Sequence, residues 1–408
     1  MDGARTRGHP AALAAIGAMV LSPSRAPHAV LLSGPGGVGK TTLALDLAAG
    51  LLCSADDPAA RPCRICRGCR MVASGGHPDL HVLRPDGAGA QIGIGGRDAK
   101  VRGVRDLSDD LSLMPMEGGA RVAIIESANR MNEDAQGALL KTLEEPPGGV
   151  TIILCADDED RLLPTIRSRC ARHRLGRVGA RDVEAILADH GLTDAPLAGR
   201  LARLSGGRPG VAMAYARSPE SVRLRGELAR QLLDLSDASA SARLATIRSA
   251  GPTALDLIDA LDAAAAMSVD PVAASKPAAG RRGKATTARP ATVISSDAGS
   301  DDADETASEE GPTRAIPAAR RRRAAEALIA VWMDVARDLA LVAADGTQSL
   351  RDPDLLEESV RAAAGLPTGS PARFLATLER GAELVAGNVS PELVLDSLVL
   401  AWPERRAA

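Results

Sequence analysis

The stretch that decides the fold of this chain is GPGGVGKT, at residues 34–41. It fits the pattern Gly-x-x-x-x-Gly-Lys-[Ser/Thr] at every required position. Before it, the apolar run Ala29–Leu32 predicts a buried strand, and after it Thr41–Leu52 carries leucines at helical spacing. A strand, a loop and a helix in this order are the context in which the pattern binds phosphate groups.

The loop has the chemistry of a nucleotide site. Its glycines let successive backbone N–H groups curl around a phosphate, and the helix N-terminus that follows adds a favourable dipole. Lys40 is expected to reach the β- and γ-phosphates of ATP, and the Thr41 hydroxyl is expected to ligate Mg²⁺. The predicted nucleotide-binding residues of the loop are Gly34, Gly36, Gly37, Val38, Gly39, Lys40, Thr41 and Thr42.

Apolar runs alternate with helical stretches as far as about Arg174. Further strands are predicted at Arg121–Ile125 and Thr151–Leu154, and a helix is predicted at Asp134–Glu145, where two prolines stop it. Strands that alternate with helices imply a parallel sheet covered on both faces. The sequence therefore predicts an α/β P-loop domain.

The rest of the chain has a helical pattern. Short helices are predicted at Asp182–His190 and Leu197–Leu204, followed by a glycine-rich break at residues 206–210. A later stretch at about 268–317 is rich in Ala, Ser, Thr, Pro and Gly and lacks apolar periodicity, so we expect it to be a disordered insert. The expected domains are a P-loop domain at 1–176, a small helical lid at 177–218 and an all-helical domain at 219–408.

The second strand ends in a single carboxylate. A P-loop ATPase usually needs a carboxylate at the end of a neighbouring strand to orient Mg²⁺, and hydrolysis also needs a group that positions the attacking water. Here Glu126 can serve the metal, whereas Ser127 stands where many such enzymes carry a second carboxylate. A serine without an activating neighbour is a poor general base at neutral pH. The sequence thus predicts ATP binding with weak or absent hydrolysis.

Four cysteines lie in one short segment after the loop helix, at Cys53, Cys63, Cys66 and Cys69. Four thiolates can enclose Zn²⁺ tetrahedrally and leave no open position for catalysis, so the predicted site is a structural zinc site. Iron–sulfur ligation and reactive thiols are the alternatives, because both also use such spacings. Cys155 and Cys170 lie outside this group and are expected to be small buried residues.

Bulk composition limits the choice of function. The formal net charge is −3, so no global basic field indicates nucleic acid. Tyr215, Trp332, Phe374 and Trp402 are all the aromatic residues, which leaves too few rings to bind single strands by base stacking. No run of about 20 apolar residues and no signal sequence are present, and we expect a cytoplasmic, nucleoid-associated protein.

With these pieces in place, the chain resembles the AAA+ subunits of bacterial clamp loaders. The stretches that carry the resemblance are ALLKTLEEPP at 138–147, LLPTIRSRC at 162–170 and the four-cysteine insertion after the loop helix. The run IIESANRM at 124–131 is more similar to the delta-prime group than to the gamma/tau motor group. The motor group typically keeps an Asp/Glu pair at the two positions where this chain has Glu126 and Ser127. The resemblance is specific over about the first half of the chain.

The resemblance implies roles for two arginines. Arg169, in the Ser-Arg-Cys motif, would be an arginine finger that reaches the γ-phosphate of ATP on a neighbouring subunit, whereas sequence alone favours pairing with a local carboxylate. Arg208 matches the place of a nucleotide-sensing arginine, and a charge at a helix terminus is the alternative. His9 stands where the family often has Gln, which puts the adenine contact in doubt.

The implied function is that of a delta-prime subunit in the DNA polymerase III holoenzyme. It would join gamma/tau and delta subunits in a hetero-pentamer, with the all-helical domain in a collar, and help load the sliding clamp onto primed DNA. The first alternative is an ATP-hydrolysing motor subunit, against which Ser127 argues. The second is a AAA+ adaptor in DNA repair.

Overall fold

Five parallel strands form the sheet that carries the phosphate loop. In the computed structural model, which describes residues 3–85, 91–96, 99, 101–117, 119–266, 316–387 and 389–404, the strand order is β2-β3-β4-β1-β5. The strands are β1 (Ala29–Ser33), β2 (Leu80–Leu83), β3 (Arg121–Ile125), β4 (Val150–Ala156) and β5 (Ala171–Arg174). In register, Ser33 of β1 lies opposite Ala156 of β4 and Arg174 of β5. The C-terminal ends of these strands therefore meet at one edge, where the loop begins.

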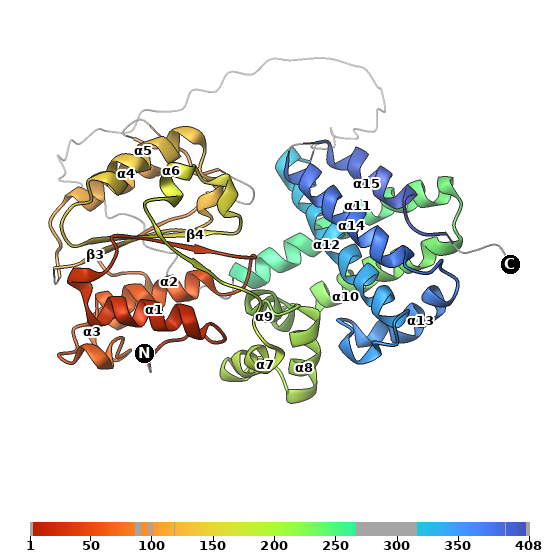
Figure 1. The fold of residues 1–408 in the computed structure, drawn as a ribbon, viewed down its shortest axis with the longest axis horizontal. Helices are drawn as coiled ribbons and strands as arrows, with labels where there is room; N and C mark the ends of the chain where they lie inside the picture. The colour runs from red at the N-terminus through yellow and green to blue at the C-terminus, as the bar shows by residue number, and fades with distance from the viewer. Residues whose placement is uncertain are drawn as a thin grey trace, which may run out of the picture.

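Alternate strand residues supply two hydrophobic cores, one on each face of the sheet. Val30 and Leu32 of β1 pack into one core, and Ala29 and Leu31 pack into the other. Figure 1 shows the sheet edge-on between the two helical layers. One layer contains α1 (Pro10–Leu21), α2 (Lys40–Leu51) and α3 (Arg67–Ser74), and the other contains α4 (Val104–Ser112), α5 (Glu133–Glu144) and α6 (Pro164–Arg167). The predicted α/β fold class is confirmed.

The three strands and two helices that the sequence predicts in this region are present, with ends within two residues of the predicted ones. Two edge strands were not predicted. β5 reads Ala-Arg-His-Arg and alternates between half-buried and exposed side chains, so it has no apolar run. β2 has only four residues and lies at the other edge of the sheet. A short or polar edge strand gives a weak sequence signal because only part of it is buried.

A small helical unit follows the sheet. It consists of α7 (Ala180–Asp189), α8 (Ala195–Leu204) and α9 (Pro209–Arg217), and it has its own core around Val183, Leu201 and Tyr215. Figure 1 places these helices at the junction between the sheet and the C-terminal helices. The expected helices at 182–190 and 197–204 are confirmed, but the break expected at 206–210 is shorter, because α9 already begins at Pro209.

The C-terminal region is all helical. Its helices are α10 (Pro219–Leu233), α11 (Ala240–Ala266), α12 (Ala318–Val342), α13 (Leu356–Ala364), α14 (Ser370–Ala386) and α15 (Pro391–Leu400). They share one core, in which the rings of Phe374 and Trp402 meet edge to face at 4.9 Å. The predicted disordered insert at 268–317 lies outside the described residues except for its last two. Within the described part of the chain, no helix is both long enough and apolar enough to span a membrane.

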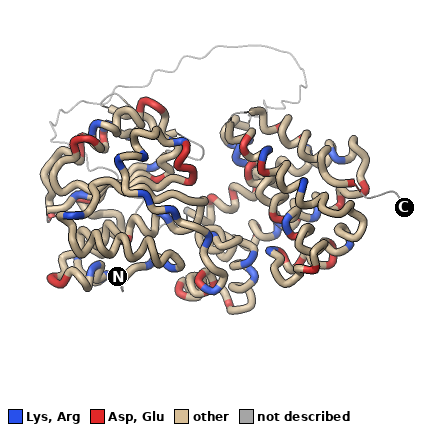
Figure 2. The backbone as a smooth tube through the Cα atoms, in the orientation of Figure 1, with Lys and Arg blue, Asp and Glu red and all other residues tan. Residues whose placement is uncertain are grey.

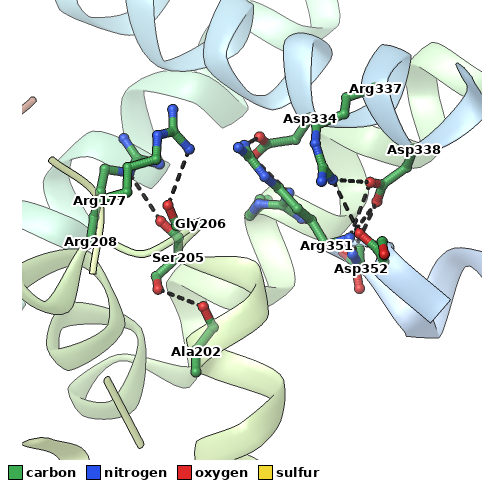
Figure 3. A network of polar contacts seen from close by, with 12 residues as sticks. Arg177, Ala202, Ser205, Gly206, Arg208, Asp334, Arg337, Asp338, Arg351 and Asp352 are labelled. Carbon is green, nitrogen blue, oxygen red and sulfur yellow. Dashed lines mark hydrogen bonds and ion pairs between the residues drawn. The ribbon is translucent and has the colours of Figure 1, made fainter. Parts of the chain in front are cut away.

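Buried ion pairs tie the C-terminal helices together (Figure 3). Arg225 of α10 pairs with Asp334 of α12 at 3.1 Å and with Asp352 at 2.8 Å. Arg351 also pairs with Asp334, and the Asp338 carboxylate accepts from the backbone N–H groups of Arg351 and Asp352. Figure 2 shows that acidic and basic residues are interspersed along the described chain.

Two further arginines lie near this network and hold the helical unit. Arg177 donates to the Gly206 carbonyl at 3.1 Å, and Arg208 donates to the Ser205 carbonyl at 3.0 Å. Figure 3 shows these two hydrogen bonds at the left, facing the ion pairs of the network. Burial, together with the positive charges of Arg177 and Arg208, lowers the pKa of Arg351 to about 10. Arg208, a predicted nucleotide-site residue, is therefore held by Ser205 within the helical unit, near the network.

We predict that Asp334→Ala destabilises the C-terminal region by roughly 3–5 kcal/mol, because it leaves buried Arg225 without one of its two carboxylate partners. Chemical denaturation followed by circular dichroism measures the change. The control is Asp259→Ala, which removes the half-exposed pair with Arg320 and should cost less than about 1 kcal/mol. Equal unfolding midpoints for the two variants would contradict this account of the network.

Candidate functional site

The phosphate loop has a backbone that only glycine adopts readily at three positions. Gly34, Gly37 and Gly39 have φ angles of 140°, 81° and 107°, in the left-handed region. A Cβ on Gly34 would lie 2.1 Å from the Leu175 carbonyl oxygen, so this residue is also fixed by space. The loop joins β1 to α2, which begins at Lys40. The strand, loop and helix thus have the predicted order, while the nucleotide-binding role of residues 34–42 stays a prediction.

The Lys40 ammonium is held by three oxygen atoms. Its Nζ donates to the carbonyls of Gly34 at 2.6 Å and Pro35 at 2.8 Å, and to Oδ1 of Asp157 at 2.7 Å. Lys40 is buried, whereas the Asp157 side chain is about half exposed. An ammonium has three N–H donors, so these partners use all of them. Thr41 is half-buried and Thr42 exposed, in the first turn of α2.

Two other segments hold the loop carbonyls. The buried His9, just before α1, lies with Nε2 at 2.9 Å from the Val38 carbonyl, to which it donates. On the other side, the Gly210 N–H at the start of α9 donates to the Gly37 carbonyl at 2.8 Å. Since a Cβ on Gly210 would meet the backbone of Gly37 at 3.1 Å, the small helical unit approaches the loop as closely as a glycine allows.

Glu126 lies at the end of β3, where the sequence places a metal carboxylate, but it already has a partner. Its carboxylate pairs with Arg84, just after β2, at 3.0 Å. Ser127 follows with a φ of 51°, and Asn129 accepts from the Asp157 N–H at 3.0 Å. To hold Mg²⁺, Glu126 would have to exchange Arg84 for the cation. The role of Glu126 as a Mg²⁺ ligand therefore stays a prediction.

The two cysteines outside the four-cysteine group, Cys155 and Cys170, have raised pKa values. Burial raises the pKa of Cys155 in β4, and the negative charges of Glu126 and Asp157 raise it further, while Lys40 opposes them. Burial also raises the pKa of Cys170, to about 11. Both cysteines are thus neutral thiols with little reactivity.

The two predicted arginines have local partners in the single chain. Arg169 pairs with Oε1 of Glu144 at 2.7 Å and donates to the Thr165 carbonyl at 3.0 Å, with its side chain about a third exposed. Arg208 is the residue that precedes α9, next to Gly37, and its side chain makes no capping hydrogen bond there. Burial lowers the pKa of the Arg208 guanidinium. The local carboxylate that sequence alone favoured for Arg169 is present, and the role in trans stays a prediction.

The four clustered cysteines meet in space. The Sγ atoms of Cys53, Cys63, Cys66 and Cys69 all lie within 4.8 Å of one another. Cys53 is 3.5 Å from Cys63 and 3.8 Å from Cys66 between sulfurs, close to the ~3.8 Å that a tetrahedral ion with ~2.3 Å bonds requires. A cluster of several iron atoms would hold its thiolates further apart. The four sulfurs therefore fit one metal ion.

Backbone N–H groups support thiolates in this group. The N–H groups of Cys66 and Cys69 lie 3.4 and 3.3 Å from the sulfurs of Cys63 and Cys66. Burial acts to raise the pKa of Cys66, but hydrogen bonds from Cys69 and Ser54 outweigh it and bring the pKa to about 5. A thiolate is the form that binds metal. The pKa of Cys63 is lowered as well, whereas burial raises the pKa values of Cys53 and Cys69, so these two thiols would lose their protons to a bound cation. Four sulfurs leave no open position, as in a structural site.

The cysteine group is attached to the loop helix. Asp46 of α2 is buried and accepts from the N–H and the hydroxyl of Thr6, and it pairs with Arg64, which lies between the cysteines. Arg64 also donates to the Gly3 carbonyl at 2.6 Å. Through these contacts the N-terminal residues, the cysteine group and the helix after the phosphate loop form one packed unit.

Asp157 and Arg84 are site residues that sequence reasoning missed. Asp157 follows directly after the predicted strand at 151–154, and Arg84 follows the unpredicted β2. The rule that ligands gather at the carboxyl ends of parallel strands gave a signal for Asp157. Pairing it with Lys40 needs the strand order, because 117 residues separate the two.

We predict about one zinc ion per purified chain, measured by inductively coupled plasma mass spectrometry, because four thiolates at this spacing match Zn²⁺. Cys66→Ser should lose most of the metal and lower thermal stability, whereas the matched control Cys170→Ser should keep the metal. Iron in place of zinc would favour the iron–sulfur alternative, and a metal-free protein with four reactive thiols would contradict a metal site.

The part of the chain that contains the phosphate loop matches known proteins in sequence. Residues 12–178 match the family model "DNA polymerase III, delta subunit". The chain is 41% identical to the delta-prime subunit of Pseudomonas aeruginosa over 184 residues, covering 45% of this chain and 53% of that protein. It is 34% identical to the delta-prime subunit of Escherichia coli over 190 residues, covering 47% and 54%, and 39% identical to the E. coli tau subunit over 166 residues, covering 41% and 24%. The chain thus spans about half the length of the delta-prime relatives named here.

Solved structures show weaker likeness. A RuvB variant of Thermotoga maritima aligns over 52% of this chain and 61% of its own at 18% identity, with a TM-score of 0.36. A DNA polymerase III gamma subunit-related protein of T. maritima aligns over 95% of this chain and 97% of its own at 16% identity, with a TM-score of 0.38. These scores carry no functional inference. Over its P-loop region, the chain is similar in sequence to DNA polymerase III delta-prime subunits.

Proposed function

We propose that this chain acts as the delta-prime subunit of a clamp loader, helping to load the sliding clamp onto primed DNA. The observation that carries the proposal is the state of the catalytic edge. Ser127 replaces a second carboxylate, and Glu126 is paired with Arg84. A P-loop domain with such an edge is suited to bind nucleotide without turning it over rapidly. This matches a supporting member of an ATP-driven complex.

In this proposal the three structural parts have separate tasks. Residues 1–176 would bind ATP and Mg²⁺ and carry a structural zinc at the four cysteines. Residues 177–218 would form a lid that presents Arg208, and residues 219–408 would join gamma/tau and delta subunits in a pentameric collar. The protein would work in the cytoplasm at the nucleoid. The sequence relatives named as DNA polymerase III subunits support this assignment.

Arg169 would be the group that this subunit supplies to its neighbour. Its guanidinium is partly exposed and is held by Glu144, whose side chain is half exposed. A half-exposed ion pair is weak, so a phosphate of higher charge can replace the carboxylate. A guanidinium placed on the γ-phosphate of a neighbour's ATP stabilises the charge that develops in hydrolysis. Hydrolysis would then depend on assembly.

A gamma/tau-type motor subunit is the second candidate. The 39% identity to the E. coli tau subunit and the intact phosphate loop favour it. Ser127 and the pairing of Glu126 with Arg84 oppose it, since a motor must position both Mg²⁺ and water. ATP turnover by the isolated chain separates the two candidates.

We predict that Arg169→Ala lowers the ATPase rate of the complex reconstituted with gamma/tau, delta, clamp and primed DNA. An arginine finger is worth on the order of 10³ in rate, so the site that it serves should become silent. Arg169→Lys should restore little, because lysine lacks the planar fork of donors. Arg172→Ala, a change at a nearby exposed arginine, is the control and should leave the rate unchanged.

The isolated chain is assayed beside the complex and should show little or no turnover. Brisk hydrolysis by the isolated chain, together with an unaltered complex for Arg169→Ala, would overturn the assignment and move the motor candidate ahead.

A further inference from the structure

A carboxylate lies over the phosphate loop. Oδ1 of Asp157 accepts from Nζ of Lys40 at 2.7 Å, and both Asp157 carboxylate oxygens lie 3.8 Å from the point where Gly36 would carry a Cβ. Asp157 is therefore placed above the first half of the loop. Apart from its neighbours in the chain, no atom of the described residues lies within 4 Å of the corresponding point on Gly39, in the second half of the loop.

The backbone around Asp157 is held in place. Its N–H donates to Asn129 Oδ1 at 3.0 Å, and the carbonyl of the preceding residue, Ala156, accepts from the Gly34 N–H at 3.2 Å. One contact ties the end of β4 to the turn after β3, and the other ties it to the start of the loop. The carboxylate is thus presented to Lys40 by two neighbouring strands rather than by a free loop.

This contact competes with only one part of a nucleotide. In a P-loop the backbone N–H groups cradle the α- and β-phosphates, while the lysine reaches the β- and γ-phosphates. Asp157 occupies one donor of Lys40 and lies over Gly36, but it does not reach Gly39. A γ-phosphate would have to displace it or accept a like charge at contact distance, and that juxtaposition is unfavourable. A β-phosphate in the backbone cradle does not meet the same obstacle.

We propose that Asp157 is a specificity-determining residue that takes the place of the γ-phosphate on Lys40 and makes this site favour nucleoside diphosphate over nucleoside triphosphate. The inference rests on the proposed nucleotide binding and deepens it. It assigns the site a resting ligand, a diphosphate, and it gives a physical reason for weak turnover besides Ser127. The nucleotide on this subunit is then a structural ligand, while triphosphate acts at neighbouring sites.

The test is a competition titration with the full chain in Mg²⁺. ATP and ADP each displace a fluorescent analogue of ADP from the wild-type chain, Asp157→Asn, Asp158→Asn and Lys40→Ala. Asp157→Asn keeps the shape and removes the charge. Asp158→Asn is the matched control, because it removes the same charge one residue away, where the side chain caps a turn by accepting from the Asp160 N–H.

We expect the wild-type chain to bind ADP at least as tightly as ATP. Asp157→Asn should tighten ATP binding by about tenfold or more, the scale of a removed like charge, and change ADP binding much less. Asp158→Asn should behave as wild type, and Lys40→Ala should lose affinity for both nucleotides. An Asp157→Asn chain whose ATP and ADP affinities match those of the wild type would overturn the role of Asp157 and leave nucleotide binding intact.

Failure of the proposed nucleotide binding looks different. If the wild-type chain and Asp157→Asn both fail to bind either nucleotide while their circular dichroism spectra are those of folded protein, nucleotide binding and the inference fall together. Binding of ATP that appears only in Asp157→Asn would support the inference, since the carboxylate would then be the group that excludes the triphosphate.

Discussion

The Lys40 ammonium is the point on which the arrangement of this site depends. It joins two carbonyls of its own loop to Asp157 at the end of β4, and so fixes the loop against the sheet edge. His9 and Gly210 hold two further loop carbonyls from opposite sides. Because β1, β3 and β4 are parallel, their C-terminal ends bring the phosphate loop, Glu126 and Asp157 to one edge of the sheet. A phosphate group that binds Lys40 must exchange with an oxygen atom that its Nζ contacts.

Each end of the loop is coupled to another part of the fold. Through α2 and Asp46, it contacts the cysteine group and the N-terminal residues, and through Gly210 it contacts α9. Arg208 precedes α9, which packs against α11 of the C-terminal region. The loop thus has a continuous packed path to the C-terminal helices.

Much of this could be predicted from sequence because it depends on local pattern. The loop at 34–41, the strand at 121–125 and the cysteine spacing each carry their signal within a few residues. β5 could not be predicted, because an edge strand reading Ala-Arg-His-Arg buries too little. The pairing of Asp157 with Lys40 and of Arg84 with Glu126 depends on which strands are neighbours, and a single sequence does not give the strand order.

The central claim is that this chain works as one member of a hetero-oligomer. Native mass spectrometry of the chain mixed with the gamma/tau and delta subunits of the same organism tests it most directly. The account predicts a five-subunit complex that contains this chain and does not form without it. A mixture in which the other subunits assemble together while this chain stays alone, folded and with its metal bound, would contradict the account.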